Sequence, residues 1–99
     1  MRRAFNDVVS MYKEKLGVDL SYMHFRTGKL PLRIDGSICY DLKPEECGGD
    51  WTSKQFIRLN PDILSVKRHY GIESMSDYEF ELHIIAHELA HEIWNNIAS

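Results

Sequence analysis

The sequence predicts an α+β fold with an N-terminal helix, a small antiparallel sheet of three or four strands, a short helix and a long C-terminal helix. Two observations predict this class. Apolar residues recur at helical spacing near both ends of the chain, and between the ends they alternate with polar residues, as strands do. The strand segments are joined by short turns, which favours antiparallel pairing and helices layered on a sheet.

The composition limits the fold and the partners. The chain has 99 residues and 43% apolar content, enough for one modest core but not for two, so we expect a single domain over residues 1–99. The formal net charge of -3 does not indicate nucleic acid as a partner. No stretch approaches the roughly 20 apolar residues of a membrane span, and the N-terminus lacks an apolar signal run. We expect a cytoplasmic protein without a membrane partner and make no prediction of its oligomeric state.

The first helix is expected to end near Leu16. Its apolar face consists of residues at helical spacing: Phe5, Val8, Val9, Tyr12 and Leu16. Gly17 follows at the position of a C-terminal cap. A first strand is predicted over residues 18–25, where β-favouring residues alternate with polar ones.

The middle of the chain carries the best hairpin signal. Residues 30–34 and 38–42 alternate between apolar and polar around an Asp-Gly turn at residues 35–36. Residues 43–54, rich in glycine, are expected to form a surface loop. This loop carries Trp51, which we interpret as a core residue or as a substrate-stacking residue at the rim of a cleft.

The two cysteines are expected to be reduced thiols, because the chain shows no export signal. Cys39 and Cys47 also lack the short paired spacing of a thiolate zinc site. We assign Cys39 to a strand and Cys47 to a loop, and we place neither in the functional site.

A strand over residues 55–59 and a short helix over residues 61–70 are predicted next. Asn60 precedes Pro61 as an expected N-cap, and Gly71 ends the helix. The C-terminal helix is predicted from residue 77 to about residue 96. Its start has the S-x-x-E form of a capping box, and no glycine or proline interrupts it.

This last helix contains the motif H-E-x-x-H at residues 87–91. On a helix, residues four apart lie on one face, so His87 and His91 are predicted to bind one zinc ion. Glu88 is the predicted catalytic residue, which accepts a proton from the zinc-bound water and passes it to the leaving amine. The ordinary alternative is an exposed polar stripe in which Glu88 forms salt bridges with its neighbours.

A catalytic zinc takes three protein ligands, and the third is not evident. Zincins usually take it from downstream of the helix, but eight residues follow His91, so we expect the native protein to continue past Ser99. His83 lies about 12 Å along the helix from His91, too far to share the ion, and is interpreted as a supporting or surface residue. The internal candidates share only a ligating side chain: His24, Asp41, Asp50, His69 and Glu73.

The motif and the segment FIRLNPDIL at residues 56–64 resemble the SprT-like family of small zincins. In outline, the resemblance covers about residues 5–96. It implies zinc ligands at His87 and His91, a catalytic Glu88 and the hydrolysis of peptide bonds in a protein or peptide substrate. The family also has a later histidine ligand, which this sequence lacks.

Three hypotheses of function follow from these residues. The first is a SprT-like zinc metallopeptidase. The second is a related zincin of the ImmA/IrrE type, which cleaves a repressor. The third is a non-enzymatic binding or scaffold domain with an incomplete metal site.

Overall fold

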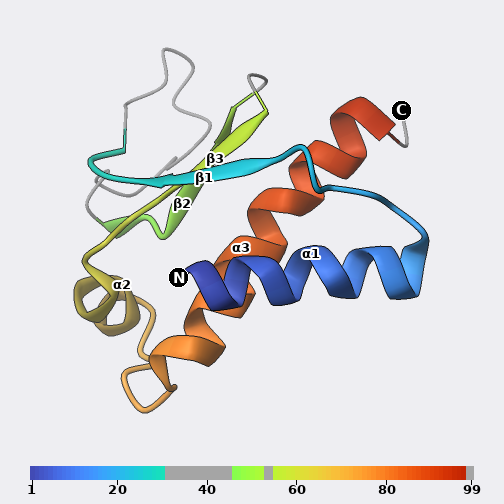
Figure 1. Ribbon diagram of the computed structural model, residues 1–99. Coiled ribbons are helices and arrows are strands. Elements are labelled where there is room, and N and C mark those ends of the chain that lie inside the picture. The colour runs from blue at the N-terminus through green and yellow to red at the C-terminus, as the bar shows by residue number, and fades with distance from the viewer. Residues whose placement is uncertain (31–45, 53–54, 98–99) are drawn as a thin grey trace.

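The computed structural model describes residues 1–30, 46–52 and 55–97, and their arrangement is α+β, as predicted (Figure 1). The elements in chain order are α1 (Arg2–Leu16), β1 (His24–Thr27), β2 (Gly49–Thr52), β3 (Phe56–Leu59), α2 (Ile63–His69), α3 (Asp77–Glu92) and η2, a π-helical turn at Ile93–Ile97. Helices α1 and α3 cross each other beside the sheet, and α2 lies near the start of α3 (Figure 1).

The described sheet is mixed rather than antiparallel throughout. Its strand order is β1-β3-β2, and β3 pairs antiparallel with β2 but parallel with β1. The antiparallel prediction is therefore wrong for the β1–β3 pair. Parallel neighbours need a long crossover connection, and the chain between Thr27 and Phe56 is long enough to supply one. Residues 31–42 of the predicted hairpin lie outside the described residues.

Strand β1 begins at His24, well after the predicted start at residue 18. Leu20, one of the residues that suggested alternation, and Met23 are both buried in the core. They belong to a turn, in which the Met23 amide donates to the Leu20 carbonyl at 3.0 Å. Asp19 accepts a hydrogen bond from the Ser21 amide in the same turn. A local turn thus produced the pattern that we interpreted as a strand.

The predicted loop over residues 43–54 contains β2, and the predicted N-cap of the short helix is displaced by two residues. Asp62, not Asn60, caps α2 by accepting from the Ser65 amide at 3.2 Å. Asn60 instead accepts from the Asp62 amide at 2.9 Å and donates to the Cys47 carbonyl at 2.8 Å. Asn60 therefore ties the start of α2 to the residues before β2.

The core lies between the two crossing helices and one face of the sheet. Phe25, Ile57 and Trp51 occupy paired positions across the three strands. Phe25 contacts Phe5 of α1, with ring centroids 5.0 Å apart. The fully buried members come from all layers: Val8, Leu20, Ile57, Leu59, Ile85 and Leu89. Side chains alternate along a strand. The row of Phe25, Ile57 and Trp51 and the row two positions along, which contains Gly49, therefore face the helices.

The cysteine and membrane predictions have different outcomes. Cys47 is buried and disulfide-bonded, so the expectation of a reduced thiol is wrong at this residue. Cys39 lies outside the described residues. Among the helices that the structure describes, none combines the length and the apolar character that a membrane crossing requires.

The cap of α3 gives a first testable prediction. Ser76 Oγ accepts from the Glu79 amide at 3.1 Å, as the capping box predicted. Ser76→Ala removes this acceptor, so the free energy of unfolding should fall by about 1 kcal/mol in a urea titration. Ser74→Ala, in the exposed turn before the helix, is the matched control and should change it by less than about 0.5 kcal/mol. Equal effects of the two substitutions would contradict the capping role.

Candidate metal centre

The H-E-x-x-H motif lies on the second half of α3, where the helix passes β2. His87 and His91 are exposed, and their ring centroids are 5.0 Å apart. Glu88 is buried, with only 9% of its side chain accessible against 68% for His87. The helix therefore presents two imidazoles to solvent and turns the carboxylate between them toward the sheet.

These three side chains form the only converging group of three or more His, Cys, Asp or Glu within residues 1–30, 46–52 and 55–97. Their ligand atoms all lie within 4.8 Å of one another, and Glu88 Oε1 is 3.9 Å from His87 Nε2. Two nitrogens that share a tetrahedral zinc ion lie about 3.4 Å apart. Two imidazoles and one adjacent carboxylate, grouped in this way, could hold a metal ion.

None of the described candidates for a third ligand joins this group. Asp50 alternates with Gly49 and Trp51, so it faces the side of the sheet away from α3. His69 Nδ1 lies 3.8 Å from Glu46, and Glu73 pairs with Arg68 at 3.5 Å. His24 is exposed on β1, the strand farthest from β2 in the described sheet, and Asp41 lies outside the described residues. The predicted pair His87 and His91 is brought together, but no candidate completes it.

A cleft of about 370 Å³ adjoins the motif. Its walls come from α3, from the end of α2 and from the residues at the start of β2: Cys47, Gly48, Gly49, Tyr70, His83, Ile84, His87 and Glu88. This volume lies within the range of about 300–1,000 Å³ that is typical of ligand pockets. Cys47, which we excluded from the site on sequence grounds, therefore forms part of its wall.

Gly48 and Gly49 let this wall approach α3 closely. A Cβ at Gly49 would lie 3.0 Å from the Arg58 carbonyl oxygen and 3.2 Å from Glu88 Cγ. A Cβ at Gly48 would lie 2.5 Å from Ile84 Cδ1. Interiors are close-packed, so a side chain at Gly48 would displace the Ile84 side chain, and one at Gly49 would crowd the Arg58 carbonyl and Glu88.

One residue after the second histidine, Glu92 is almost fully buried, at 2% exposure. Its carboxylate accepts hydrogen bonds from Tyr22 Oη at 2.5 Å, Trp51 Nε1 at 3.0 Å and Asn96 Nδ2 at 2.8 Å. Burial raises the pKa of Glu92, but these three hydrogen bonds outweigh it and hold the pKa below its ordinary value. Trp51 also lies beside His91, with ring centroids 6.3 Å apart.

Sequence reasoning missed the contributions of Tyr22 and Glu92 and left Trp51 undecided. Trp51 is half-buried on β2, so it is neither a loop residue nor a fully buried core residue. The partners are distant in sequence, since Trp51 and Glu92 are 41 positions apart and Tyr22 and Glu92 are 70 positions apart. The one local signal is a carboxylate within the apolar surface of a helix, which marks a residue that needs buried donors.

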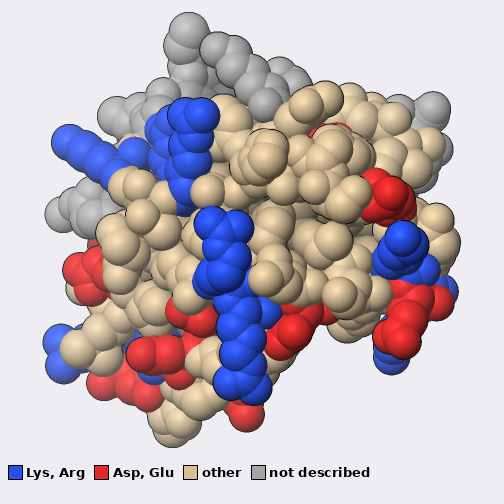
Figure 2. Space-filling view, in the orientation of Figure 1, with Lys and Arg blue, Asp and Glu red and all other residues tan. Residues whose placement is uncertain are grey.

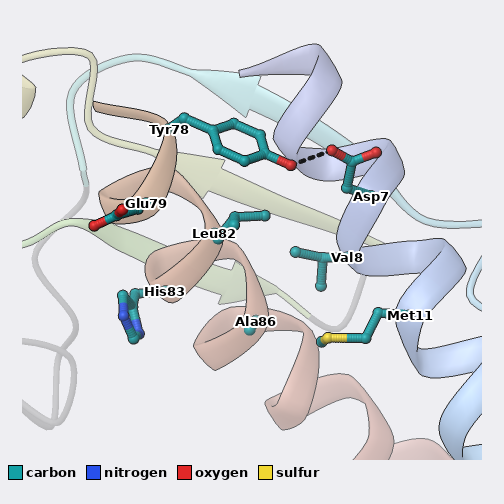
Figure 3. Close-up of a pocket in the computed structure, with 8 residues that line it drawn as sticks. All are labelled: Asp7, Val8, Met11, Tyr78, Glu79, Leu82, His83 and Ala86. Carbon is teal, nitrogen blue, oxygen red and sulfur yellow. Dashed lines mark hydrogen bonds between the residues drawn. The ribbon is translucent and has the colours of Figure 1, made fainter. Parts of the chain in front are cut away.

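A second cavity, of about 450 Å³, lies between α1 and α3 (Figure 3). Val8, Met11 and Leu82 give it an apolar lining, and Tyr78 donates a hydrogen bond to Asp7 at its edge. His83 lines this cavity as well as the motif cleft, and it projects from α3 on the side away from α1 (Figure 3). His83 is exposed and is not part of the converging group, in line with its interpretation as a surface residue.

The charged side chains do not form a field of one sign on the face shown in Figure 2, where Lys and Arg lie among Asp and Glu. Several charged side chains of the described residues are paired. Lys67 Nζ lies 2.8 Å from Asp77, and Arg3 Nε lies 4.0 Å from Asp7. This distribution agrees with the small net charge of -3.

The glycine contacts generate a second prediction. Gly49→Ala should lower the free energy of unfolding by about 1–3 kcal/mol, because its Cβ meets a backbone oxygen that cannot move aside. The conflict at Gly48 is with the Ile84 side chain alone. In double-mutant cycles measured by urea unfolding, Ile84→Ala should therefore relieve Gly48→Ala more than Gly49→Ala. Gly49→Ala with wild-type stability would disprove the close approach.

The hydrogen bonds of Glu92 generate a third prediction, on pH dependence. Burial, the hydrogen bond to Glu92 and the charge of Glu92 raise the pKa of Tyr22 from 10.0 to about 12. Because the pKa is higher in the folded state, the stabilising contribution is fully present below pH 10 and is lost as the pH rises toward 12. In an ultraviolet titration of tyrosine ionisation, Tyr22→Phe should lack one of the tyrosines that ionise late in the wild type. The control Tyr70→Phe should retain that group, and its loss there would contradict the assignment.

Comparisons with known proteins identify no relative of this chain. No family model, curated protein or solved structure matches the chain. The function is therefore argued from the chemistry of His87, Glu88 and His91 and from their place beside the cleft.

Proposed function

We propose that this protein is a zinc-dependent metallopeptidase of the SprT-like type, which hydrolyses peptide bonds in a protein or peptide substrate. The observation that carries the proposal is the convergence of two exposed imidazoles and one buried carboxylate at the edge of a cleft. Of these residues, His87 and His91 would hold the metal and Glu88 would act as general base and acid. The order of residues along α3 supports these roles, because Glu88 lies between the two histidines but points to the sheet.

The donor set suits zinc better than a hard cation. Imidazole nitrogen is a common zinc ligand, whereas calcium and magnesium prefer sites built from oxygen. His87 and His91 supply two of the three protein ligands that catalytic zinc sites use, and the described residues supply no third. When bound in such a site, zinc supplies Lewis acidity, which lowers the pKa of water to about 7 and polarises a carbonyl.

Glu88 can move protons because of where its carboxylate lies. It is within the cleft wall, and Gly49 lies so near that a Cβ at this glycine would be 3.2 Å from Glu88 Cγ, which restricts the Glu88 side chain. A carboxylate held in this way can accept a proton from the attacking water and deliver it to the amine that leaves when the peptide bond breaks. The two proton transfers balance, since the amine leaves with the proton that the water lost.

The open side of the cleft suits an extended chain. His87 and Tyr70 are exposed at its rim, so this side of the motif is open to solvent. A peptide could therefore bring a backbone carbonyl close to the motif without displacing a protein side chain. This feature favours polypeptide over a compact small molecule as substrate.

The fourth prediction tests this proposal. Glu88→Gln should lower the rate of cleavage of an unfolded protein by about 100- to 10,000-fold, because the amide cannot accept the proton. Zinc content, measured by mass spectrometry after dialysis, should remain that of the wild type, since the histidines are unchanged. Glu14→Gln, the same chemical change on the exposed face of α1, is the control and should retain full activity. Wild-type cleavage by Glu88→Gln would refute the proposed role.

A further inference from the structure

Glu92 is unusual because it is a buried carboxylate next to an exposed metal-binding histidine. Its three hydrogen-bond donors come from three segments: Tyr22 precedes β1, Trp51 is on β2 and Asn96 is in η2. Burying a carboxylate is costly even when it is hydrogen-bonded, and an apolar side chain could fill this position at lower cost. An apolar residue could not, however, accept a hydrogen bond from the N–H group of a neighbouring indole and so fix the orientation of the indole ring.

The indole in question flanks the metal motif. The Trp51 ring lies at 31° to the His91 ring, with centroids 6.3 Å apart. The His87 and His91 rings meet edge to face, with centroids 5.0 Å apart and an interplanar angle of 84°. His91 is exposed, so the rings of Trp51 and His87, rather than a surrounding core, limit the rotation of its side chain. The side-chain Nδ2 of Asn95 also donates to the His91 carbonyl at 2.8 Å, which holds the backbone of the proposed ligand.

We propose that Glu92 is a positioning residue of the metal centre, which orients Trp51 and through it keeps the His91 imidazole turned toward His87. Metal-binding histidines depend on outer partners for their orientation, and loss of such a partner typically costs about 10- to 100-fold in metal affinity. Here the partner acts on the ring through packing, and Glu92 itself does not bind the metal, because it is outside the converging group. The inference rests on the proposed pairing of His87 and His91 as ligands.

The chain offers a matched set of variants. Glu92→Gln weakens the acceptor for both Trp51 and Tyr22, and Trp51→Phe keeps an aromatic ring but removes the N–H group. Tyr22→Phe removes a hydrogen bond from the same carboxylate but leaves the bond to Trp51 in place. If the network is only structural, Tyr22→Phe and Trp51→Phe should change zinc affinity to a similar extent. If Glu92 positions His91 through Trp51, zinc affinity should fall only when the hydrogen bond between Glu92 and Trp51 is broken.

The experiment measures zinc affinity by chelator competition on the full chain, with the unfolding midpoint measured in parallel. Glu92→Gln and Trp51→Phe should each bind zinc about 10- to 100-fold more weakly. Their double variant should lose little more than either single variant, because both break one link. Tyr22→Phe should stay within about threefold of wild type although its stability falls. The visible spectrum of the cobalt-substituted protein should shift in the first two variants and not in Tyr22→Phe.

A second readout needs no metal. In the metal-free protein, NMR couplings of the His91 side chain should report one dominant rotamer in wild type and Tyr22→Phe, and averaging in Glu92→Gln and Trp51→Phe. If the protein binds zinc and these two variants keep wild-type affinity and rotamer, the positioning role is overturned while the proposed centre stands. If wild type binds no zinc and His91 is averaged, both are overturned.

Discussion

The fold around the site depends on the close approach of β2 to α3. Gly49 and Trp51 point toward the helix from alternate positions of the strand, and Glu88 and Glu92 point back from positions one helical turn apart. Two residues of a strand span about 7 Å and four residues of a helix span about 6 Å. The two spacings nearly match, so one strand can contact two successive turns, and glycine is required where the contact is tightest.

This packing separates residues that are adjacent in sequence. With β2 covering one side of α3, Glu88 is buried while His87 and His91 remain exposed on the adjoining side. A metal ligand must be reachable by the ion, whereas a group that transfers protons gains from being held in one place. The helix alone determines which residues share a side, and the strand determines which side is closed to solvent.

The parts of the structure that local sequence determines were predicted well. Ser76 caps α3, and Gly17 adopts a φ of 66° at the end of α1, because both signals act within one turn of helix. Predictions that depend on distant partners failed more often. Strand β2 looked like a loop because Gly48, just before it, and Gly49, its first residue, are required by the close contact with α3. The parallel pairing of β1 with β3 follows from a crossover that no local pattern encodes. The histidine pair was predictable, but its supporting residues were not.

The proposed function gives Glu88 and Glu92 two different roles, although they are the same residue type on one side of one helix. Both carboxylates are buried, yet Glu88 borders the cleft and Glu92 does not. Glu92 is satisfied by three donors that keep it ionised and fixed, which suits a residue that orients its neighbours. Glu88 lies where a substrate can enter, which suits a group that must gain and lose a proton. Access and hydrogen bonding, rather than position in the motif alone, therefore distinguish a proton carrier from an anchor.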